Sequence, residues 1–424
     1  MSLNETPSAN RIHIAFFGRR NAGKSSLVNA VTGQNLALVS DIKGTTTDPV
    51  YKSMELLPLG PVMIIDTPGF DDQGALGEMR VNKARQVLNK TDAAVLVLDG
   101  ENAQDNIFDA ENELIGIFKT KNIPYIIVQN KIDLNSQNTA AQVNKERGGS
   151  ETGSRQQPCA FASVREIFGN DVLAVSAKTG LNINLLKEKI TQTAKPAETQ
   201  DKLIEDLIKP NDFILLVIPI DKAAPKGRLI LAQQQMIRSI LDAGAAAISV
   251  KESGLKETLA SLGKKPSLVI TDSQVFAEVS ALVPDEIPLT SFSILFARYK
   301  GFLKTAVKGV LALDKINDGD KILICEGCTH HRQCDDIGTV KIPRMIKSFT
   351  QKNPEFIFYS GGDFPQDLSL YKLIIHCGSC MLNQREMNYR RSLSEEQNIP
   401  FTNYGIVIAH IQGILKRSIA IFNF

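Results

Sequence analysis

The chain has 424 residues, of which 43% are hydrophobic and 22% are charged, and its formal net charge is +2. This composition excludes a disordered or fibrous chain, and the charge balance excludes a global field that would hold the protein on nucleic acid or anionic lipid. Because one hydrophobic core stops growing at about 250–300 residues, we expect two or three domains.

We examined residues 1–10 and 404–424 for the patterns of a secretory signal and a membrane span. Residues 1–10 are polar and lack the apolar core of a secretory signal, so we expect a cytoplasmic protein. The apolar stretch at 404–424 is interrupted by polar and charged residues and is too polar to cross a bilayer. We expect it to form a buried or docked helix.

Alternating strands and helices are predicted over the first part of the chain. Strand-like apolar segments recur, with amphipathic stretches between them, at 11–17, 62–65, 93–98, 125–129 and 172–176. Such alternation favours a mostly parallel sheet that is covered on both faces, so the predicted fold class is α/β. We expect the first domain over 8–195, with a polar surface insertion at 136–158.

A glycine-rich loop follows the first predicted strand and precedes a helix at 24–32. Its sequence, GRRNAGKS, fits the G-x-x-x-x-G-K-[ST] phosphate loop. In this motif the backbone N–H groups face the phosphates, Lys24 reaches the β and γ phosphates, and Ser25 ligates magnesium (Mg²⁺). The residues predicted to bind the nucleotide here are Gly18, Asn21, Ala22, Gly23, Lys24, Ser25 and Ser26.

A second set of residues is predicted to bind magnesium and the γ-phosphate. The DTPG segment that begins at Asp66 follows a strand, so Asp66 can face the ion through water and the Gly69 amide can contact the γ-phosphate. Thr46 is the expected switch threonine that completes the magnesium shell. Phe70 stands where Ras-type enzymes carry a water-positioning glutamine, so hydrolysis needs other assistance. The candidate catalytic residues are Asn21, Lys24, Thr46 and Gly69.

Two more loops are predicted to bind guanine. The first follows the strand at 125–129, and its Asp133 carboxylate can accept two parallel N–H bonds from guanine, which adenine does not offer. The second loop, at 176–178, would bring its backbone to the guanine carbonyl. The residues of the two loops are Asn130, Lys131, Asp133, Ser176, Ala177 and Lys178. Together the loops predict a Ras-like P-loop domain that hydrolyses GTP to GDP and phosphate.

Asn21, inside the phosphate loop, has two interpretations. Its side-chain oxygen would help to hold a monovalent cation against the nucleotide and so supply the positive charge that an arginine finger gives elsewhere. In the alternative, Asn21 only stabilises the loop. The loop and switch pattern resembles the tRNA-modification and ribosome-assembly branch of small GTPases, several of which are activated by potassium. This resemblance implies hydrolysis that potassium (K⁺) stimulates.

The rest of the chain is expected to form two further domains. Residues 194–209 are interpreted as a linker. A smaller series of alternating strands and helices then predicts an α/β middle domain over 205–285, and 286–424 form a third, C-terminal α/β domain. The helix-like runs 228–241 and 406–421 are interpreted as core or interface faces.

Cysteines stand at the ends of strands in the third domain. The buried strands expected there are 321–325, 356–359 and 373–376. Cys325 ends the first of them and Cys377 follows the last, and ligands on adjacent loops at strand ends can converge on one point. The charged segment 384–396, which includes Arg385, Arg390 and Arg391, is interpreted as solvated surface.

Three cysteines have the spacing of a metal site. Cys377 and Cys380 form a Cys-x-x-Cys loop, and Cys328 lies far earlier in the chain. Three thiolates with optional imidazoles suit either tetrahedral zinc or an iron–sulfur cluster. The residues alone leave both open, and cysteines that are buried without a metal are the third interpretation.

Other polar residues near the three cysteines have less defined roles. His330, His376 and Asp335 are candidates for weak fourth ligation of a metal, and the two histidines are alternatively groups that hydrogen-bond to and orient the thiolates. For Cys325 and Cys334 structural burial is the preferred interpretation. Because both lie near Cys328, a closed site with four cysteine ligands is the alternative.

The order of these features resembles one family. A phosphate-loop GTPase, a small middle domain and a C-terminal Cys-x-His…His-Cys-x-x-Cys pattern, in that order, are similar to the FeFe-hydrogenase maturation GTPases, the HydF family. The resemblance covers essentially the whole chain. It implies that Cys328, Cys377 and Cys380 hold a 4Fe–4S cluster, which leaves one iron with an exchangeable position.

The resemblance also implies a function. Members of this family are scaffolds and carriers for a transient di-iron subcluster precursor, assembled with two radical-SAM maturases and passed to the apo FeFe-hydrogenase. The middle domain would mediate a homodimer, with no nucleic-acid or membrane partner. The alternative function is a potassium-dependent RNA- or ribosome-assembly GTPase with a zinc-binding C-terminal module. The near-neutral charge and the lack of a basic, aromatic-interleaved stretch disfavour this alternative.

Overall fold

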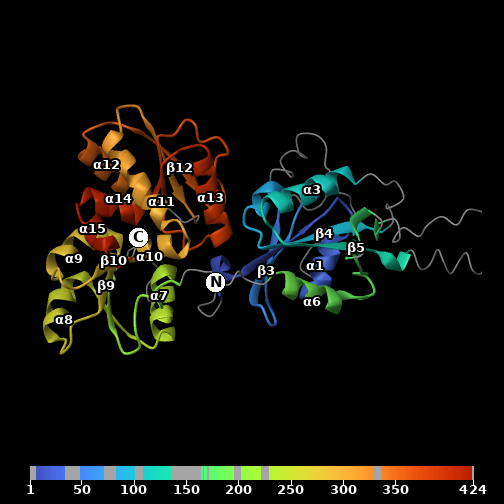
Figure 1. Cartoon of the computed structure of the whole chain (residues 1–424), viewed down its shortest axis with the longest axis horizontal. Coiled ribbons are helices and arrows are strands. Elements are labelled where there is room, and N and C mark those ends of the chain that lie inside the picture. Colours follow the sequence, from blue (N-terminus) through green and yellow to red (C-terminus); the bar gives the residue numbers. More distant parts are fainter. Residues whose placement is uncertain are drawn as a thin grey trace, which may run out of the picture. The chain divides into compact units, whose positions relative to one another are not determined.

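The computed structural model describes residues 6–33, 48–70, 83–100, 108–134, 164–165, 167–169, 171–194, 202–220, 229–327 and 336–422. The chain divides into two compact units, Met1–Ala197 and Glu198–Phe424 (Figure 1). The insertion expected at 136–158 lies outside the described residues. None of the described helices combines the length and the apolar character needed to span a membrane.

The described part of the first unit contains a six-stranded sheet in the order β2-β3-β1-β4-β5-β6. Its strands are β1 (Ile12–Phe17), β2 (Val50–Leu56), β3 (Gly60–Asp66), β4 (Ala93–Asp99), β5 (Tyr125–Asn130) and β6 (Leu173–Ala174). β2 runs antiparallel to β3, and the other neighbouring pairs are parallel. The five strands expected from the sequence are confirmed. β2 was missed because its inward-facing residues include the buried Lys52, which interrupts the apolar pattern.

Helices cover both faces of this sheet. They include α1 (Lys24–Thr32), α3 (Asp109–Thr120) and α6 (Ile183–Thr193), and a 3-10 turn lies at Ser8–Asn10 before β1. Apolar residues of α1 and α6 pack with one face of the strands, and residues of α3 pack with the other, so two cores form (Figure 1). The layered α/β fold predicted for this unit is therefore confirmed.

The described part of the second unit contains two four-stranded sheets, β10-β9-β7-β8 and β12-β11-β13-β14. The strands of the first are β7 (Phe213–Val217), β8 (Ala246–Val250), β9 (Leu268–Thr271) and β10 (Leu289–Ser291). Those of the second are β11 (Lys321–Glu326), β12 (Glu355–Ser360), β13 (Leu373–His376) and β14 (Phe401–Asn403). All the neighbouring strands in both sheets are parallel.

Helices connect and cover these two sheets. They are α7 (Leu231–Asp242), α8 (Leu255–Ser261), α9 (Phe276–Leu282), α10 (Phe292–Tyr299), α11 (Leu303–Gly309), α12 (Ile342–Thr350), α13 (Gln384–Glu396), α14 (Tyr404–Ile411) and α15 (Leu415–Ile419). Shorter 3-10 segments lie at Glu252–Gly254, Ser273–Val275 and Val310–Lys315, and a π segment lies at Ile337–Lys341. The strands and helices expected from the sequence over both sheets are present, with shifts of a few residues at their ends.

The two sheets repeat one strand order. Numbered along the chain within each sheet, both read second, first, third, fourth. A helix follows the fourth strand in each case, α10 after β10 and α14 after β14, and the two helices meet near their first turns. There the backbone N–H of Gly405 donates to Ser293 Oγ at 3.3 Å, and a Cβ on Gly405 would lie 2.7 Å from Ser293 Cβ.

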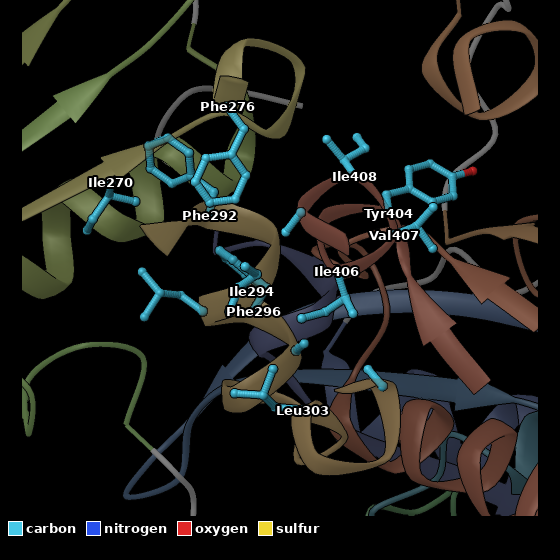
Figure 2. Close-up of a cluster of buried hydrophobic side chains, with 14 of the residues drawn as sticks. Ile270, Phe276, Phe292, Ile294, Phe296, Leu303, Tyr404, Ile406, Val407 and Ile408 are labelled. Carbon is cyan, nitrogen blue, oxygen red and sulfur yellow. The ribbon is translucent and has the colours of Figure 1, made fainter. Parts of the chain in front are cut away.

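The two sheets share one hydrophobic core. Side chains of α10, among them Ile294 and Phe296, gather with Ile406 of α14 in a single buried cluster (Figure 2). This cluster extends from Leu203 to Phe422 along the chain. The boundaries expected at 205, 285 and 286 stay predictions, because one continuous core joins the segments on either side.

Two interpretations of the second unit are wrong. The segment 194–209 was interpreted as a linker, but Leu203, Ile204 and Ile208 are buried in the shared core. The stretch 404–424 is predicted to form one buried or docked helix, but its described part is divided between α14 and α15. Gly413 between them has φ +72°, a left-handed conformation that ends a helix and that glycine adopts without strain.

Candidate nucleotide site and cysteine site

The phosphate loop lies between the end of β1 and the start of α1. Gly23 precedes the helix with φ +84°, and exposed Asn21 has φ +62°, so the backbone between them turns sharply. A Cβ at Gly18 would lie 2.4 Å from Val97 O, which requires glycine where the loop leaves the sheet. The Lys24 ammonium is buried and donates to Gly18 O at 2.9 Å and to Arg19 O at 2.8 Å.

Ser25 and Asp66 form a set of oxygen donors beside this loop. Ser25 Oγ donates to Asp66 Oδ2 at 2.5 Å, while the buried Asp66 Oδ1 has no hydrogen-bond partner among the described residues. Burial raises the pKa of Asp66, opposed by the Ser25 hydrogen bond and by the charges of Lys24 and Lys52. Hard oxygen ligands with an unsatisfied carboxylate atom fit Mg²⁺. Thr46, the other expected ligand, lies outside the described residues.

The loop after β3 is tied to β1. Thr67 Oγ1 donates to Phe16 O at 2.7 Å, which holds the start of the loop next to the phosphate-binding segment. Gly69 follows and is partly buried. The Phe70 side chain packs against the core on the α3 face. It has no polar group that could position water at the nucleotide.

Asn130 joins the two predicted guanine loops to the phosphate loop. Its Nδ2 donates to Ala22 O at 3.2 Å and Gly23 O at 3.4 Å, and its Oδ1 accepts the Ala177 N–H at 3.0 Å. The structure therefore brings together three loops that are far apart in the sequence. A Cβ on Gly23 would lie only 2.3 Å from Asn130 Nδ2, so the contact requires glycine at that position.

The remaining guanine-loop residues lie around Asn130. Ser176 Oγ donates to Asp133 Oδ1 at 2.7 Å, which orients the carboxylate that was predicted to read the base. Lys131 has φ +64°, and its ammonium donates to Asp99 Oδ2 at 2.9 Å. Lys178 is exposed. The predicted residues that the structure describes are thus gathered at one end of the sheet.

Sequence reasoning missed an ion pair that holds the phosphate loop. Arg19 donates from Nε to Glu111 Oε1 at 2.7 Å and from Nη2 to Oε2 at 2.8 Å. Glu111 is buried on α3, on the same helical face as Leu114 and Phe118. The sequence signal for this ion pair was a charged residue, Glu111, at helical spacing from the apolar residues of an amphipathic helix.

The cysteine site begins where two neighbouring strands end. β11 and β13 are parallel neighbours, and Cys325 pairs with His376. Cys377 therefore follows β13 at the edge where the chain also leaves β11. Cys377 Sγ accepts the Gly327 N–H at 3.1 Å and the Ser379 N–H at 3.4 Å. Gly327, at the end of β11, thus lies next to Cys377, while convergence of the cysteine ligands stays a prediction.

The third expected cysteine ligand, Cys328, lies outside the described residues, as do His330, Cys334 and Asp335. The described residues alone contain no group of three or more metal-ligating side chains. Cys325 is fully buried in the shared core, in keeping with the structural role preferred for it. The described part of the site thus consists of Cys377 and Cys380, both partly buried.

The two described thiols are of the kind that can ligate zinc or an iron–sulfur cluster. Burial raises the pKa of Cys377, and burial raises the pKa of Cys380 to about 12, so both are protonated at neutral pH until a metal displaces the protons. Backbone N–H groups directed at a sulfur stabilise a metal-bound thiolate and tune a cluster. Cys377 has two such donors, from Gly327 and Ser379.

His376 and Arg390 form a buried pair behind the cysteine loop. His376 Nε2 lies 3.0 Å from Arg390 Nη1, and its Nδ1 lies 3.1 Å from both Cys377 O and Ser379 Oγ. Burial, and then the charge of Arg390, lower the pKa of His376 to about 3. The ring is therefore neutral.

The interpretation of 384–396 as solvated surface is wrong for Arg390. α13 packs one face against the unit, and Arg390 on that face has an exposed fraction of 0%. Glu386 and Met387 are buried on the same face, four and three residues before Arg390. This helical spacing was the available signal, and it was outweighed by the high charge of the segment.

Three family models match the chain in succession. The model of the 50S ribosome-binding GTPase matches residues 13–131, that of the hydrogen maturase F dimerization domain matches 203–301, and that of the hydrogen maturase F tetramerization domain matches 304–421. The last two matches follow each other along the chain and together cover the segments that form the shared core. The chain belongs to the hydrogen maturase F family.

Other GTPases are similar over part of the chain. GTPase Der of Nautilia profundicola is 33% identical over 204 residues, which are 46% of this chain and 40% of that protein. The tRNA modification GTPase MnmE of Endomicrobium trichonymphae is 29% identical over 247 residues, 57% of this chain and 48% of that protein. The chain thus spans less than half the length of these curated relatives. A crystal structure of Aquifex aeolicus Era has 19% identity and a TM-score of 0.33, covering 59% of this chain and 98% of Era.

Hydrogen maturase F membership confirms the predicted fold class and domain order. The P-loop GTPase domain comes first, the sheet β7 to β10 lies within the dimerization match, and β11 to β14 lie within the tetramerization match. The presence of both oligomerization domains supports an oligomeric protein. Cys377 and Cys380 lie within the tetramerization match.

Proposed function

We propose that this protein is a GTP-hydrolysing scaffold and carrier in FeFe-hydrogenase maturation. The observation that carries the proposal is the succession of a GTPase match and two hydrogen maturase F matches on one chain. The cysteine loop at the end of β13 adds the chemistry that a carrier of iron needs. GTP hydrolysis and maturation are thus assigned to the two units of the chain.

The nucleotide site supports hydrolysis with magnesium. Lys24 would bind the β and γ phosphates, Ser25 and Asp66 would hold Mg²⁺ together with Thr46, and the Gly69 amide would contact the γ-phosphate. Bound Mg²⁺ neutralises charge on the phosphates. The proposed nucleotide-binding residues are Gly18, Asn21, Ala22, Gly23, Lys24, Ser25, Ser26, Thr46, Asp66, Gly69, Asn130, Lys131, Asp133, Ser176, Ala177 and Lys178.

Potassium is the proposed source of the positive charge that an arginine finger supplies in other GTPases. Asn21 is exposed with φ +62°, so its side-chain oxygen is available to a cation beside the nucleotide. We expect GTP turnover to rise sharply in potassium relative to sodium at equal ionic strength. Asn21→Gly tolerates the left-handed backbone and removes the oxygen, so it should lose the stimulation while it still binds GTP. Equal turnover of the unmodified protein in the two salts would contradict the role of potassium.

A 4Fe–4S cluster is the proposed resident group of the second unit. Cys328, Cys377 and Cys380 would hold it, and the N–H groups of Gly327 and Ser379 would stabilise the Cys377 thiolate. Three thiolates leave one iron with an exchangeable position, at which a di-iron precursor can be accepted. His330, His376 and Asp335 are the candidates for weak occupation of that position.

The proposed partners follow from family membership. The di-iron subcluster precursor would be received with the help of two radical-SAM maturases and delivered to the apo FeFe-hydrogenase in the cytoplasm. The dimerization match over β7 to β10 supports a homodimer. We infer that the nucleotide state controls association with the partners, because the phosphate loop and the cysteine loop belong to separate units.

Anaerobic iron analysis with matched cysteine variants tests the function. Reconstituted protein should be brown and hold about four irons per chain. Cys377→Ala should lose most of the iron, because it removes a proposed ligand. Cys325→Ala should keep it, because this thiol is buried in the core and pairs in the sheet with His376, the residue before Cys377. Colourless protein that binds zinc would overturn the proposal and favour an RNA- or ribosome-assembly GTPase.

A further inference from the structure

The guanidinium of Arg390 is buried behind the cysteine loop and is held on several sides. Its Nη2 donates to Glu386 Oε1 at 2.7 Å and to Gly361 O at 2.8 Å, and its carbon lies 5.2 Å from the centre of the Phe364 ring. A buried charge is costly unless it is paired and hydrogen-bonded, so this arrangement is built around one fixed orientation of the arginine. Its remaining polar neighbour is His376.

The contact with Arg390 determines which His376 nitrogen carries the proton. A guanidinium can only donate, so His376 Nε2, 3.0 Å from Arg390 Nη1, must be the accepting nitrogen. The proton of the neutral ring therefore sits on Nδ1. That nitrogen lies 3.1 Å from Cys377 O and 3.1 Å from Ser379 Oγ, and both atoms can accept the proton.

The loop that receives this hydrogen bond is the one that presents the thiols. Ser379 Oγ donates to Cys377 O at 3.1 Å, and Ser379 has φ +60°. Its N–H is directed at Cys377 Sγ. Fixing the Cys377 carbonyl and the Ser379 hydroxyl thus fixes the turn between Cys377 and Cys380.

We propose that Arg390 is a positioning residue: by donating to Nε2 it holds His376 as the Nδ1–H tautomer, which orients the Cys377–Cys380 loop and keeps His376 out of the ligand set. Metal binding by histidine needs a free nitrogen lone pair, and the one on Nε2 is engaged by Arg390. His376 is thereby removed from the candidates for the exchangeable position. The proposal rests on the proposed cluster site for its purpose, but its geometry is a property of the protein alone.

Nitrogen-15 NMR of the iron-free full-length protein tests the tautomer directly. The chain has five histidines, so selective labelling gives a small set of signals. We expect one neutral histidine protonated at Nδ1, and its signal should vanish in His376→Gln. Arg390→Met should convert that histidine to the other tautomer or to a mixture. Arg391→Met is the matched control, because Arg391 is the next residue on α13 and donates to Gly301 O instead. An Nε2-protonated His376 in the unmodified protein would overturn the proposal.

Pulsed EPR and redox titration of the reconstituted protein test the consequence for the cluster. We expect the cluster to show no hyperfine coupling to a nitrogen of His376. The spectrum of His376→Gln should therefore match that of the unmodified protein. Arg390→Met should lower the midpoint potential, since it removes a positive charge beside Cys377, and Arg390→Lys should restore most of the loss. A coupling that depends on His376, or a potential unchanged in Arg390→Met, would contradict the proposal. Unmodified protein that binds no iron would contradict the proposed function. The NMR result would still decide which tautomer His376 adopts.

Discussion

At the scale of single residues, Asn130 organises the nucleotide site. Its amide bonds to carbonyls of the phosphate loop on one side and to the Ala177 N–H on the other. Side-chain hydrogen bonds to backbone groups of two loops hold both at fixed distances before any ligand arrives. This pre-organisation lowers the entropy that nucleotide binding would otherwise cost.

The close approach of Asn130 to Gly23 makes a sharp prediction. Gly23→Ala should lower guanine-nucleotide affinity by about tenfold or more, because the new methyl would strike Asn130 Nδ2 and break its hydrogen bonds to the loop. Titration with a fluorescent GDP analogue measures the affinity.

Gly33→Ala is the matched control for this substitution. Gly33 also has positive φ, +67°, at the other end of α1, but a methyl there meets nothing within 4 Å. It should cost about 1 kcal/mol of stability and leave the affinity unchanged. Equal loss of affinity in the two variants would mean that backbone strain, and not the Asn130 contact, is responsible.

At the scale of elements, α11 packs directly on the backbone of β14. A Cβ at Gly309 would lie 2.2 Å from Phe401 O and 2.8 Å from Phe401 N. The helix can approach the strand this closely only because glycine has no side chain. The contact anchors β14, which pairs with β13 and so supports the strand that ends at the cysteine loop.

Gly309→Ala should therefore destabilise the second unit by about 1–3 kcal/mol, because the added methyl overpacks this contact. Gly309 has φ −67°, which alanine adopts freely, so the loss would be steric alone. Chemical denaturation measures the free energy of unfolding. Gly263→Ala in the same unit, whose methyl meets nothing within 4 Å, should change it by less than about 0.5 kcal/mol. An unchanged midpoint for Gly309→Ala would refute the packing argument.

At the scale of the whole molecule, the second unit is built from one strand order used twice. The sheets β7 to β10 and β11 to β14 share topology, and α10 and α14 meet at corresponding positions near Ser293 and Gly405. The match to a dimerization domain covers the first sheet and the match to a tetramerization domain covers the second. The cysteine loop extends from the second sheet, with Gly378 next to Ser293 of α10.

Much of the local structure was predictable from the sequence. The helix at 24–32 and the strands that lead into the nucleotide loops were predicted almost to the residue, because apolar periodicity and glycine turns act over a few neighbouring residues. The nucleotide loops were recognisable for the same reason, since each is a short continuous motif. β2 was not predictable, because Lys52 faces inward and disguises its apolar side.

The sequence by itself determined the α/β class, the domain order and the motifs, since these depend on short-range patterns of residue type. Only the tertiary structure decided that Asn130 bonds to the phosphate loop, that Glu111 pairs with Arg19, and that a helix full of charges buries Arg390 against His376. Such contacts join residues that are distant in the chain. They also depend on which face of a helix is buried, and composition does not reveal that face. Their partners are chosen by packing, and packing exists only in the folded chain.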